Sequence, residues 1–181
     1  MNYIGAMNYE VMNRILKAYG ILNREICFGC EIGVREGRFS EFLILNNPNL
    51  IMHCVDPYTP YKDWSQFYND NEQDNFKLEA SVRLAKFPEN AVQIFETSLE
   101  AATKAKDGQY DFVYIDALHK LKAVEDDMEA WITKVRSKGV LSGHDFSMAT
   151  VGPAVQKIAK KYGKVLYTSS TNEGDSWWFQ I

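Results

Sequence analysis

The segment from Glu31 to Gly37, which reads Glu-Ile-Gly-Val-Arg-Glu-Gly, constrains the fold more than any other part of the chain. It follows an apolar run that begins at Ile26, and it leads into residues 38–43, where apolar residues recur with helical spacing. A strand, a glycine turn and a helix in this order are typical of the nucleotide site of an open α/β sheet. Glycine lets a ligand approach the backbone closely at the helix N-terminus.

An acid at the start of this segment indicates the kind of ligand. The glycines are spaced G-x-x-x-G, which differs from the dinucleotide fingerprint G-x-G-x-x-G. Glu31 stands just before the first glycine, where a carboxylate would repel a pyrophosphate and attract an amino-acid ammonium group. The alternative is that Glu31 pairs with Arg35 or Arg38 at the surface.

Strands and helices alternate along the chain, which predicts a mostly parallel sheet covered by helices on both faces. The predicted strands are residues 26–34, 50–55, 91–96, 110–115, 139–143, 164–168 and 176–181. The predicted helices are residues 9–22, 38–45, 72–87, 98–106, 120–135 and 153–162. The last two strands are joined by a linker too short for a helical crossover, so they should form an antiparallel hairpin.

The length of 181 residues predicts a single domain, 1–181. Within it, residues 1–25 form an N-terminal helical segment, and residues 57–88 form an aromatic and helical insertion. This insertion contains the aromatic residues Tyr58, Tyr61, Trp64, Phe67 and Tyr68. It is interpreted either as a lid over a substrate pocket or as a subunit contact, and the second interpretation predicts a homodimer.

Charge and hydropathy exclude several classes of partner. The net charge is −4 and no dense cluster of Lys and Arg occurs, which argues against a nucleic-acid partner. No apolar stretch approaches the roughly 20 residues of a membrane span. The N-terminus lacks the zones of a signal peptide, so the expected location is cytoplasmic.

One cysteine pair matches a redox or zinc pattern. Cys27 and Cys30 form a C-x-x-C motif, but they lie inside a predicted strand, where residues three apart point to opposite faces. Only Cys54 remains as a further thiol, so four thiolates cannot be assembled. The cysteines are therefore interpreted as buried small residues.

Polar residues follow the predicted strands, at the sheet edge where ligands of such folds bind. These residues are Glu31, Asp56, Ser98, Asp116, His144 and Asp145. Asp56 lies 19 positions beyond Gly37, close to the offset of roughly 20 residues at which an acid binds ribose hydroxyls. The alternative is that Asp56 caps the turn before Pro57. Ser98 is likewise interpreted as a helix N-cap, or as part of a turn whose backbone meets an adenine.

Four motifs occur in order along the chain. They are Glu-Ile-Gly-Val-x-x-Gly-x-x-Ser from residue 31, Val-Asp-Pro-Tyr from 55, Asp-Phe-Val-Tyr-Ile-Asp-Ala-Leu-His from 111, and Ser-Gly-His-Asp-Phe from 142. Together they resemble the class I S-adenosylmethionine-dependent methyltransferases, and within them a small bacterial branch with YIDxxH and GHD motifs. The resemblance spans residues 26–181 and implies a Rossmann-like three-layer α/β sandwich, whose seven-stranded, mostly parallel sheet has a reversed final strand.

The resemblance also implies roles for individual residues. Glu31 and the turn from Gly33 to Gly37 would meet the methionine end of S-adenosylmethionine. Asp56 would hold the ribose and the turn at Ser98 would lie at the adenine. Asp116 would face both the cofactor and the cleft of methyl transfer. The expected activity is methylation of a small-molecule acceptor, most simply at a hydroxyl; the alternative is a non-catalytic nucleotide-binding or sensor module on the same fold.

A hydroxyl acceptor must lose a proton, and the candidate catalytic residues are Asp116, His119, His144 and Asp145. Related enzymes bind Mg²⁺ through an acid at the position of Asp116 and two oxygen ligands after the fifth strand. Here His144 stands where the first of those two ligands would be. Because Mg²⁺ prefers oxygen ligands, the metal ligands stay unassigned, and a base mechanism through histidine is the rival to a divalent ion.

Overall fold

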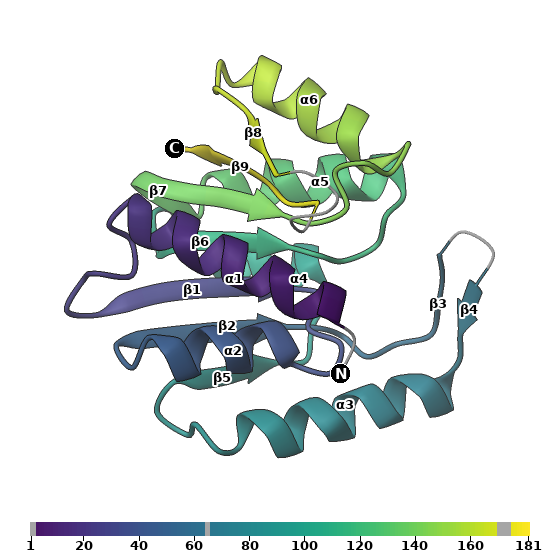
Figure 1. The fold of residues 1–181 in the computed structure, drawn as a ribbon. Helices are drawn as coiled ribbons and strands as arrows, with labels where there is room; N and C mark the ends of the chain where they lie inside the picture. Colours follow the sequence, from purple (N-terminus) through teal and green to yellow (C-terminus); the bar gives the residue numbers. More distant parts are fainter. Residues whose placement is uncertain (1–2, 64–65, 170–174) are drawn as a thin grey trace.

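A seven-stranded sheet forms the centre of the molecule (Figure 1). The computed structural model describes residues 3–63, 66–169 and 175–181, with side chains from residue 9 onward. In spatial order the strands are β5 (Ala91–Ile94), β2 (Leu50–Val55), β1 (Cys27–Ile32), β6 (Tyr110–Ile115), β7 (Val135–Gly143), β9 (Trp177–Gln180) and β8 (Tyr167–Thr168). The first five run parallel, and β9 runs antiparallel to both of its neighbours. The predicted sheet with a reversed final strand is confirmed.

Helices cover both faces of this sheet and make three layers (Figure 1). One face carries α1 (Tyr3–Ala18), α2 (Arg38–Asn46) and α3 (Asp70–Leu84). The other carries α4 (Ser98–Lys104), α5 (Leu121–Ile132) and α6 (Val151–Lys161). Every residue of β6 is buried because this strand lies under both layers. Of the helices in the described ranges, none combines the length and apolar character required to cross a bilayer.

The cysteines behave as structural residues. Cys27 packs into the core beneath α1–α3 and Cys30 into the core beneath α4–α6, so they point to opposite faces as predicted. Together with Cys54 they are buried and free. The C-x-x-C spacing therefore brings no two thiols together for redox or zinc chemistry.

The predicted bounds of β2 and β6 agree with the structure, but β7 begins four residues earlier than predicted. Val135 had been assigned to the preceding helix because it continues the helical spacing of α5. In the structure α5 ends at Ile132, and Val135 pairs with Tyr110 ahead of an irregularity in the β6–β7 register. Most of the predicted hairpin linker before β9, residues 170–174, lies outside the described residues.

The aromatic insertion contains a hairpin that the sequence analysis did not predict. Strands β3 (Tyr61–Asp63) and β4 (Gln66–Tyr68) pair antiparallel, and they stand apart from the main sheet at the edge where its parallel strands end (Figure 1). Tyr61 and Tyr68 stack across the hairpin with ring centroids 4.8 Å apart. The predicted aromatic residue Trp64 lies outside the described residues. The hairpin thus adds a wall above the sheet edge that was expected to bind a ligand.

Candidate active site

The glycine turn after β1 is fixed by the neighbouring strand. Gly33 has a φ of +87°, and a Cβ built there would lie 2.1 Å from the carbonyl oxygen of Asp116. This approach follows from the sheet order, since β1 pairs with β6 and the Asp116 N–H donates to the carbonyl of Ile32 at 2.8 Å. Gly37 also has a positive φ, of +75°, and it precedes the first residue of α2. The turn therefore leaves the edge of β1 open to a ligand.

Asp56 holds this turn from the next strand. Its Oδ2 accepts hydrogen bonds from the backbone N–H groups of Val34 and Arg35, both at 3.0 Å. Its Oδ1 accepts from the N–H of Tyr58 at 2.9 Å, so Asp56 does cap the turn at Pro57. Burial raises the pKa of Asp56, and the three backbone donors oppose that rise. A carboxylate oxygen has two lone pairs, so these bonds leave acceptor capacity for a ribose hydroxyl.

Glu31 is a buried acid, only 3% exposed. The hydroxyl of Ser40 donates to its Oε2 at 2.5 Å. Burial raises the pKa of Glu31 well above its usual range, and the nearby Asp116 and Asp56 add to the rise while Ser40 opposes it. The alternative of a surface pair with arginine is wrong, because Arg35 and Arg38 both face Glu36 instead, at 3.9 and 3.8 Å.

A cavity of about 600 Å³ opens at the carboxyl edge of the sheet. The predicted site residues that line it are Glu31, Gly33, Asp56, Ser98, Asp116 and His119. Within the described part of the chain, the predicted residues outside its lining are Gly37, His144 and Asp145. Polar lining residues that the sequence analysis missed include Tyr9, Asp63, Gln73 and Asp127. The hairpin, α1 and α5 thus contribute to the site alongside the strand ends.

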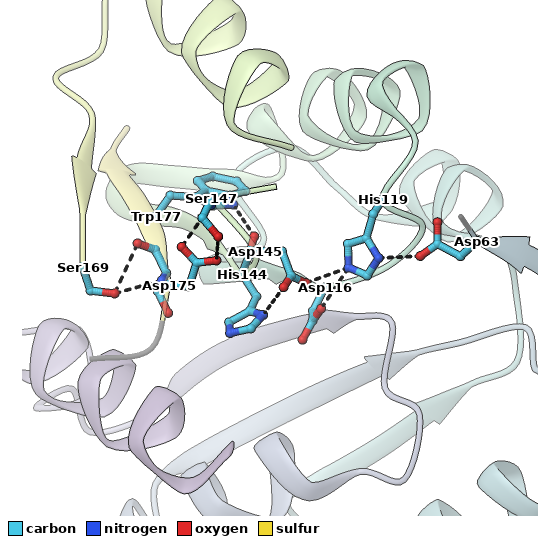
Figure 2. A network of polar contacts seen from close by, with 10 residues as sticks. Asp63, Asp116, His119, His144, Asp145, Ser147, Ser169, Asp175 and Trp177 are labelled. Carbon is cyan, nitrogen blue, oxygen red and sulfur yellow. Dashed lines mark hydrogen bonds and ion pairs between the residues drawn. The ribbon is translucent and has the colours of Figure 1, made fainter. Parts of the chain in front are cut away.

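His119 connects Asp63 with Asp116 and Asp145 in a polar network (Figure 2), and Asp63, Asp116 and His119 line the cavity. Its Nδ1 is 2.5 Å from Oδ2 of Asp63 on the hairpin. Its Nε2 is 2.7 Å from Oδ2 of Asp145 and 3.7 Å from Oδ1 of Asp116. The contact with Asp145 has the distance of an ion pair but lacks the alignment of a hydrogen bond. Burial would lower the pKa of His119, but these carboxylates outweigh it and raise the pKa to about 11.

His144 and Asp145 follow β7 and form a second ion pair. His144 Nδ1 lies 3.1 Å from Asp145 Oδ1, and Asp145 itself has a left-handed φ of 58°. Burial opposes the charged form of His144, yet the hydrogen bond to Asp145 and the charges of Asp116 and Asp175 raise its pKa to about 9. Burial alone would raise the pKa of Asp145, but His119 and His144 hold it well below its usual range.

Donor atoms of Asp116, His144 and Asp145 lie within 4.8 Å of one another, a spacing that would suit a divalent cation. The chemistry of this donor set does not fit Mg²⁺. One of the three donors is an imidazole with a raised pKa, and the Asp145 carboxylate is already paired with two imidazoles. This donor set therefore assigns no catalytic role to Mg²⁺.

The charged state of His119 predicts a pH-dependent contribution to stability. Because its pKa is raised from 6.5 to about 11, the contribution is complete below about pH 6.5 and falls as the pH rises toward 11. His119→Gln is expected to lower the free energy of unfolding by about 1.5–3 kcal/mol at pH 6 and by progressively less up to pH 10. Urea unfolding at a series of pH values measures this difference.

His53→Gln is the matched control for that series. Burial lowers the pKa of His53, so this histidine is mostly neutral in both the folded and unfolded states above about pH 7. Its effect on the free energy of unfolding should stay constant from pH 7 to pH 10. An equally constant effect for His119→Gln would contradict the charged state assigned to His119.

Comparison with known proteins identifies a family and a set of structural neighbours. Residues 30–146 match the model of a family described as a methyltransferase domain. No curated protein matches the sequence significantly. Among solved structures, a proposed caffeoyl-CoA O-methyltransferase from Staphylococcus aureus is 14% identical with a TM-score of 0.69, and the match covers 96% of this chain and 82% of that one. The O-methyltransferase TomG from Streptomyces achromogenes, solved with S-adenosylmethionine, is 14% identical with a TM-score of 0.65 and coverages of 96% and 78%.

The family match spans more than half of the chain and includes the glycine turn, Asp56, Asp116 and the pair that follows β7. At identities this low the solved structures show the fold alone, and that fold agrees with the sheet order observed here. The chain belongs to the methyltransferase domain family, within the class I S-adenosylmethionine-dependent methyltransferases.

Proposed function

We propose that this protein transfers the methyl group of S-adenosylmethionine to a hydroxyl of a small, neutral molecule. The observation that carries the proposal is that one cavity joins two kinds of surface. Buried Glu31, Asp56 and the turn at Ser98 line it along three neighbouring strand ends, and His119 lines it together with Asp63 and Asp116. The first surface suits a ligand with an ammonium group, a ribose and a base, and the second suits proton transfer.

The acceptor would bind beneath the hairpin. Asp63 and Gln73 line the cavity and are 9% and 3% exposed, yet Asp63 Oδ1 and Gln73 Nε2 have no hydrogen-bond partner among the described residues. Unpaired buried polar atoms are costly, so a ligand that supplies both a donor and an acceptor is favoured. The aromatic side chains of Tyr61, Tyr68 and Phe76 line the same cavity and offer faces for a ring. A hydroxylated ring compound meets these requirements.

The acids of the cavity disfavour an anionic acceptor. Six of its lining residues are acidic: Glu31, Glu36, Asp56, Asp63, Asp116 and Asp127. Its lining cations are Arg35, Arg38 and the partly neutralised His119. A nucleic acid or a coenzyme A thioester would bring phosphates toward carboxylates. In this proposal residues 57–88 act as a lid over the acceptor, and their role as a homodimer contact stays a prediction.

In the proposed mechanism, one group of residues binds the cofactor and another group handles the proton of the acceptor hydroxyl. S-adenosylmethionine, when bound, would supply a sulfonium methyl group, whose carbon would be transferred in line to the acceptor oxygen with S-adenosylhomocysteine as the leaving group. Asp116 is the carboxylate that accepts the hydroxyl proton, because its side chain is 37% exposed, against 11% for Asp63 and 23% for Asp145. Asp63 and Asp145 hold the His119 imidazolium in place, and its charge favours the deprotonated oxygen.

Calorimetry and a transfer assay test this proposal together. Titration with S-adenosylmethionine and S-adenosylhomocysteine should show binding in the micromolar range. Labelled S-adenosylmethionine should then transfer its methyl group to members of a panel of neutral phenols and glycosides. Binding without transfer to any class of acceptor, and unaltered by changes at Asp116 or Asp145, would favour the non-catalytic nucleotide-binding module. Transfer to nucleic acid or to protein side chains would overturn the acceptor class.

The same transfer assay also measures the effect of removing metal ions. Because the donor set of Asp116, His144 and Asp145 does not fit Mg²⁺, treatment with EDTA is expected to change the transfer rate by less than about twofold. Added Mg²⁺ is expected to leave the rate unchanged. A large loss with EDTA that Mg²⁺ reverses would contradict this and assign the three side chains to a metal site.

A further inference from the structure

Asp127 is a buried acid whose role the proposed reaction does not explain. It lies on α5, is only 6% exposed, and lines the cavity beside Ser98. No cationic side chain of the described residues forms an ion pair with it, whereas its neighbour Asp126 pairs with Lys122. A carboxylate without a cation is rarely buried in a helix face unless another group binds it.

Hydrogen bonds around Asp127 leave part of its acceptor capacity unused. The indole Nε1–H of Trp131 donates to the Ser98 hydroxyl at 2.9 Å, so the Ser98 proton is directed elsewhere and bonds to Asp127. An ionised carboxylate has about four acceptor sites, and one serine proton fills only one of them. Burial raises the pKa of Asp127 to about 6, Ser98 opposes the rise and Asp126 adds to it. At neutral pH the side chain is therefore mostly an ionised acceptor at the cavity wall.

The sheet order locates Asp127 relative to the rest of the cofactor site. Glu31, Asp56 and Ser98 follow β1, β2 and β5, which lie in that order across the sheet. If Glu31 receives the ammonium and Asp56 the ribose, the base falls beyond Asp56, at the turn that begins α4. Leu99 lies in that turn, and the lining of the same cavity also includes the apolar residues Ala117, Leu118 and Ala123. Apolar side chains beside one carboxylate suit a flat ring that carries an amino group.

We propose that Asp127 accepts a hydrogen bond from the exocyclic amino group of the adenine and so makes the site selective for an amino-purine over an oxo-purine. This inference rests on the proposed function, because it takes S-adenosylmethionine as the cofactor. Ser98 acts as a positioning residue, since its proton orients the carboxylate. Trp131 in turn orients the Ser98 hydroxyl, because its indole N–H donates to the Ser98 oxygen.

Calorimetry with two matched ligands tests the inference. The wild-type protein is expected to bind S-adenosylhomocysteine about 10-fold or more tightly than its deaminated analogue S-inosylhomocysteine, because the oxo group faces a carboxylate. Asp127→Asn presents an amide that donates to the oxo group, so the ratio of the two affinities should fall below about 3. The control Asp126→Asn, one residue away and paired at the surface with Lys122, should keep the wild-type ratio.

The pH dependence of the two affinities gives a second test, which uses the wild-type protein and so does not depend on whether a variant folds. As the pH falls from 7.5 to 5, protonation of Asp127 should reduce the preference for the adenine ligand. Glu31 and Asp56 also titrate in the cavity, but both ligands share the groups that face them, so the ratio isolates Asp127. Equal affinities for the two ligands, or a ratio unchanged in Asp127→Asn, would overturn the inference alone. If neither ligand binds, the proposed function fails with it.

Discussion

Replacing Asp116 with asparagine is expected to lower the rate of methyl transfer at least about 100-fold, with less than about a threefold change in affinity for S-adenosylhomocysteine. Asparagine keeps the size of the side chain but cannot take up the hydroxyl proton, and a positioned base contributes about 10²–10⁴-fold to such reactions. The Asp116 backbone N–H, which bonds to Ile32, is unaffected by the change. Single-turnover transfer and calorimetry on the same variant measure the two quantities.

Asp107→Asn is the matched control for this prediction. Asp107 is 74% exposed and lies before β6, at the opposite end of the strand that Asp116 follows. Its removal should leave both transfer and binding unchanged. The sequence analysis assigned Asp116 to the cofactor as well as to catalysis, and the variant separates these roles. A loss of affinity as large as the loss of rate would place Asp116 on the cofactor side.

The strand-end residues could be predicted because parallel strands bring distant positions together at one edge. Gly33, Asp56 and Asp116 lie far apart in the sequence, yet each follows an apolar run of strand length, and all three line the cavity. The chain order of elements also fixed the reversed last strand, since the connection before β9 has no room for a helix. These inferences need only local pattern and the rule that ligands bind beyond strand ends.

Other site residues could not be predicted because their positions depend on how loops fold back. Asp63 and Gln73 reach the cavity through a hairpin and the first turn of α3, and neither segment has a pattern that points toward the sheet edge. Asp127 did leave a signal. Asp127 lies on the buried face of α5, together with Val124 and Met128. A charged residue on the apolar face of an amphipathic helix is unusual.

The protonation state of His119 could not be predicted from the sequence either. His119 was a candidate base because an isolated histidine titrates near neutral pH. In the structure it meets Asp63, Asp116 and Asp145 from three different elements, and their combined charge raises its pKa to about 11. The proton-accepting role therefore passes in our proposal from the histidine to Asp116. Only the assembled fold brings these four side chains together (Figure 2).

Replacing Gly33 with alanine is expected to cost about 3–5 kcal/mol in the free energy of unfolding and to abolish cofactor binding. The left-handed backbone at φ +87° costs a non-glycine residue about 1–2 kcal/mol. A Cβ at Gly33 would also lie 2.1 Å from the Asp116 carbonyl oxygen and 2.8 Å from Cα of Ala117, and rigid backbone cannot yield as a side chain does. Relief requires β1 and β6 to separate at the edge where the cofactor binds.

Gly163→Ala separates the cost of the left-handed backbone from the cost of the steric clash. Gly163 has a comparable φ of +62°, but no atom of the described residues lies within 4 Å of a Cβ built there. This control should therefore lose only the backbone cost of about 1–2 kcal/mol and should bind S-adenosylhomocysteine normally. Urea unfolding and calorimetry on the two variants make the comparison. If Gly33→Ala loses no more stability than Gly163→Ala and still binds the ligand, then β1 and β6 do not need their close approach, and the glycine turn is not the element that shapes the site.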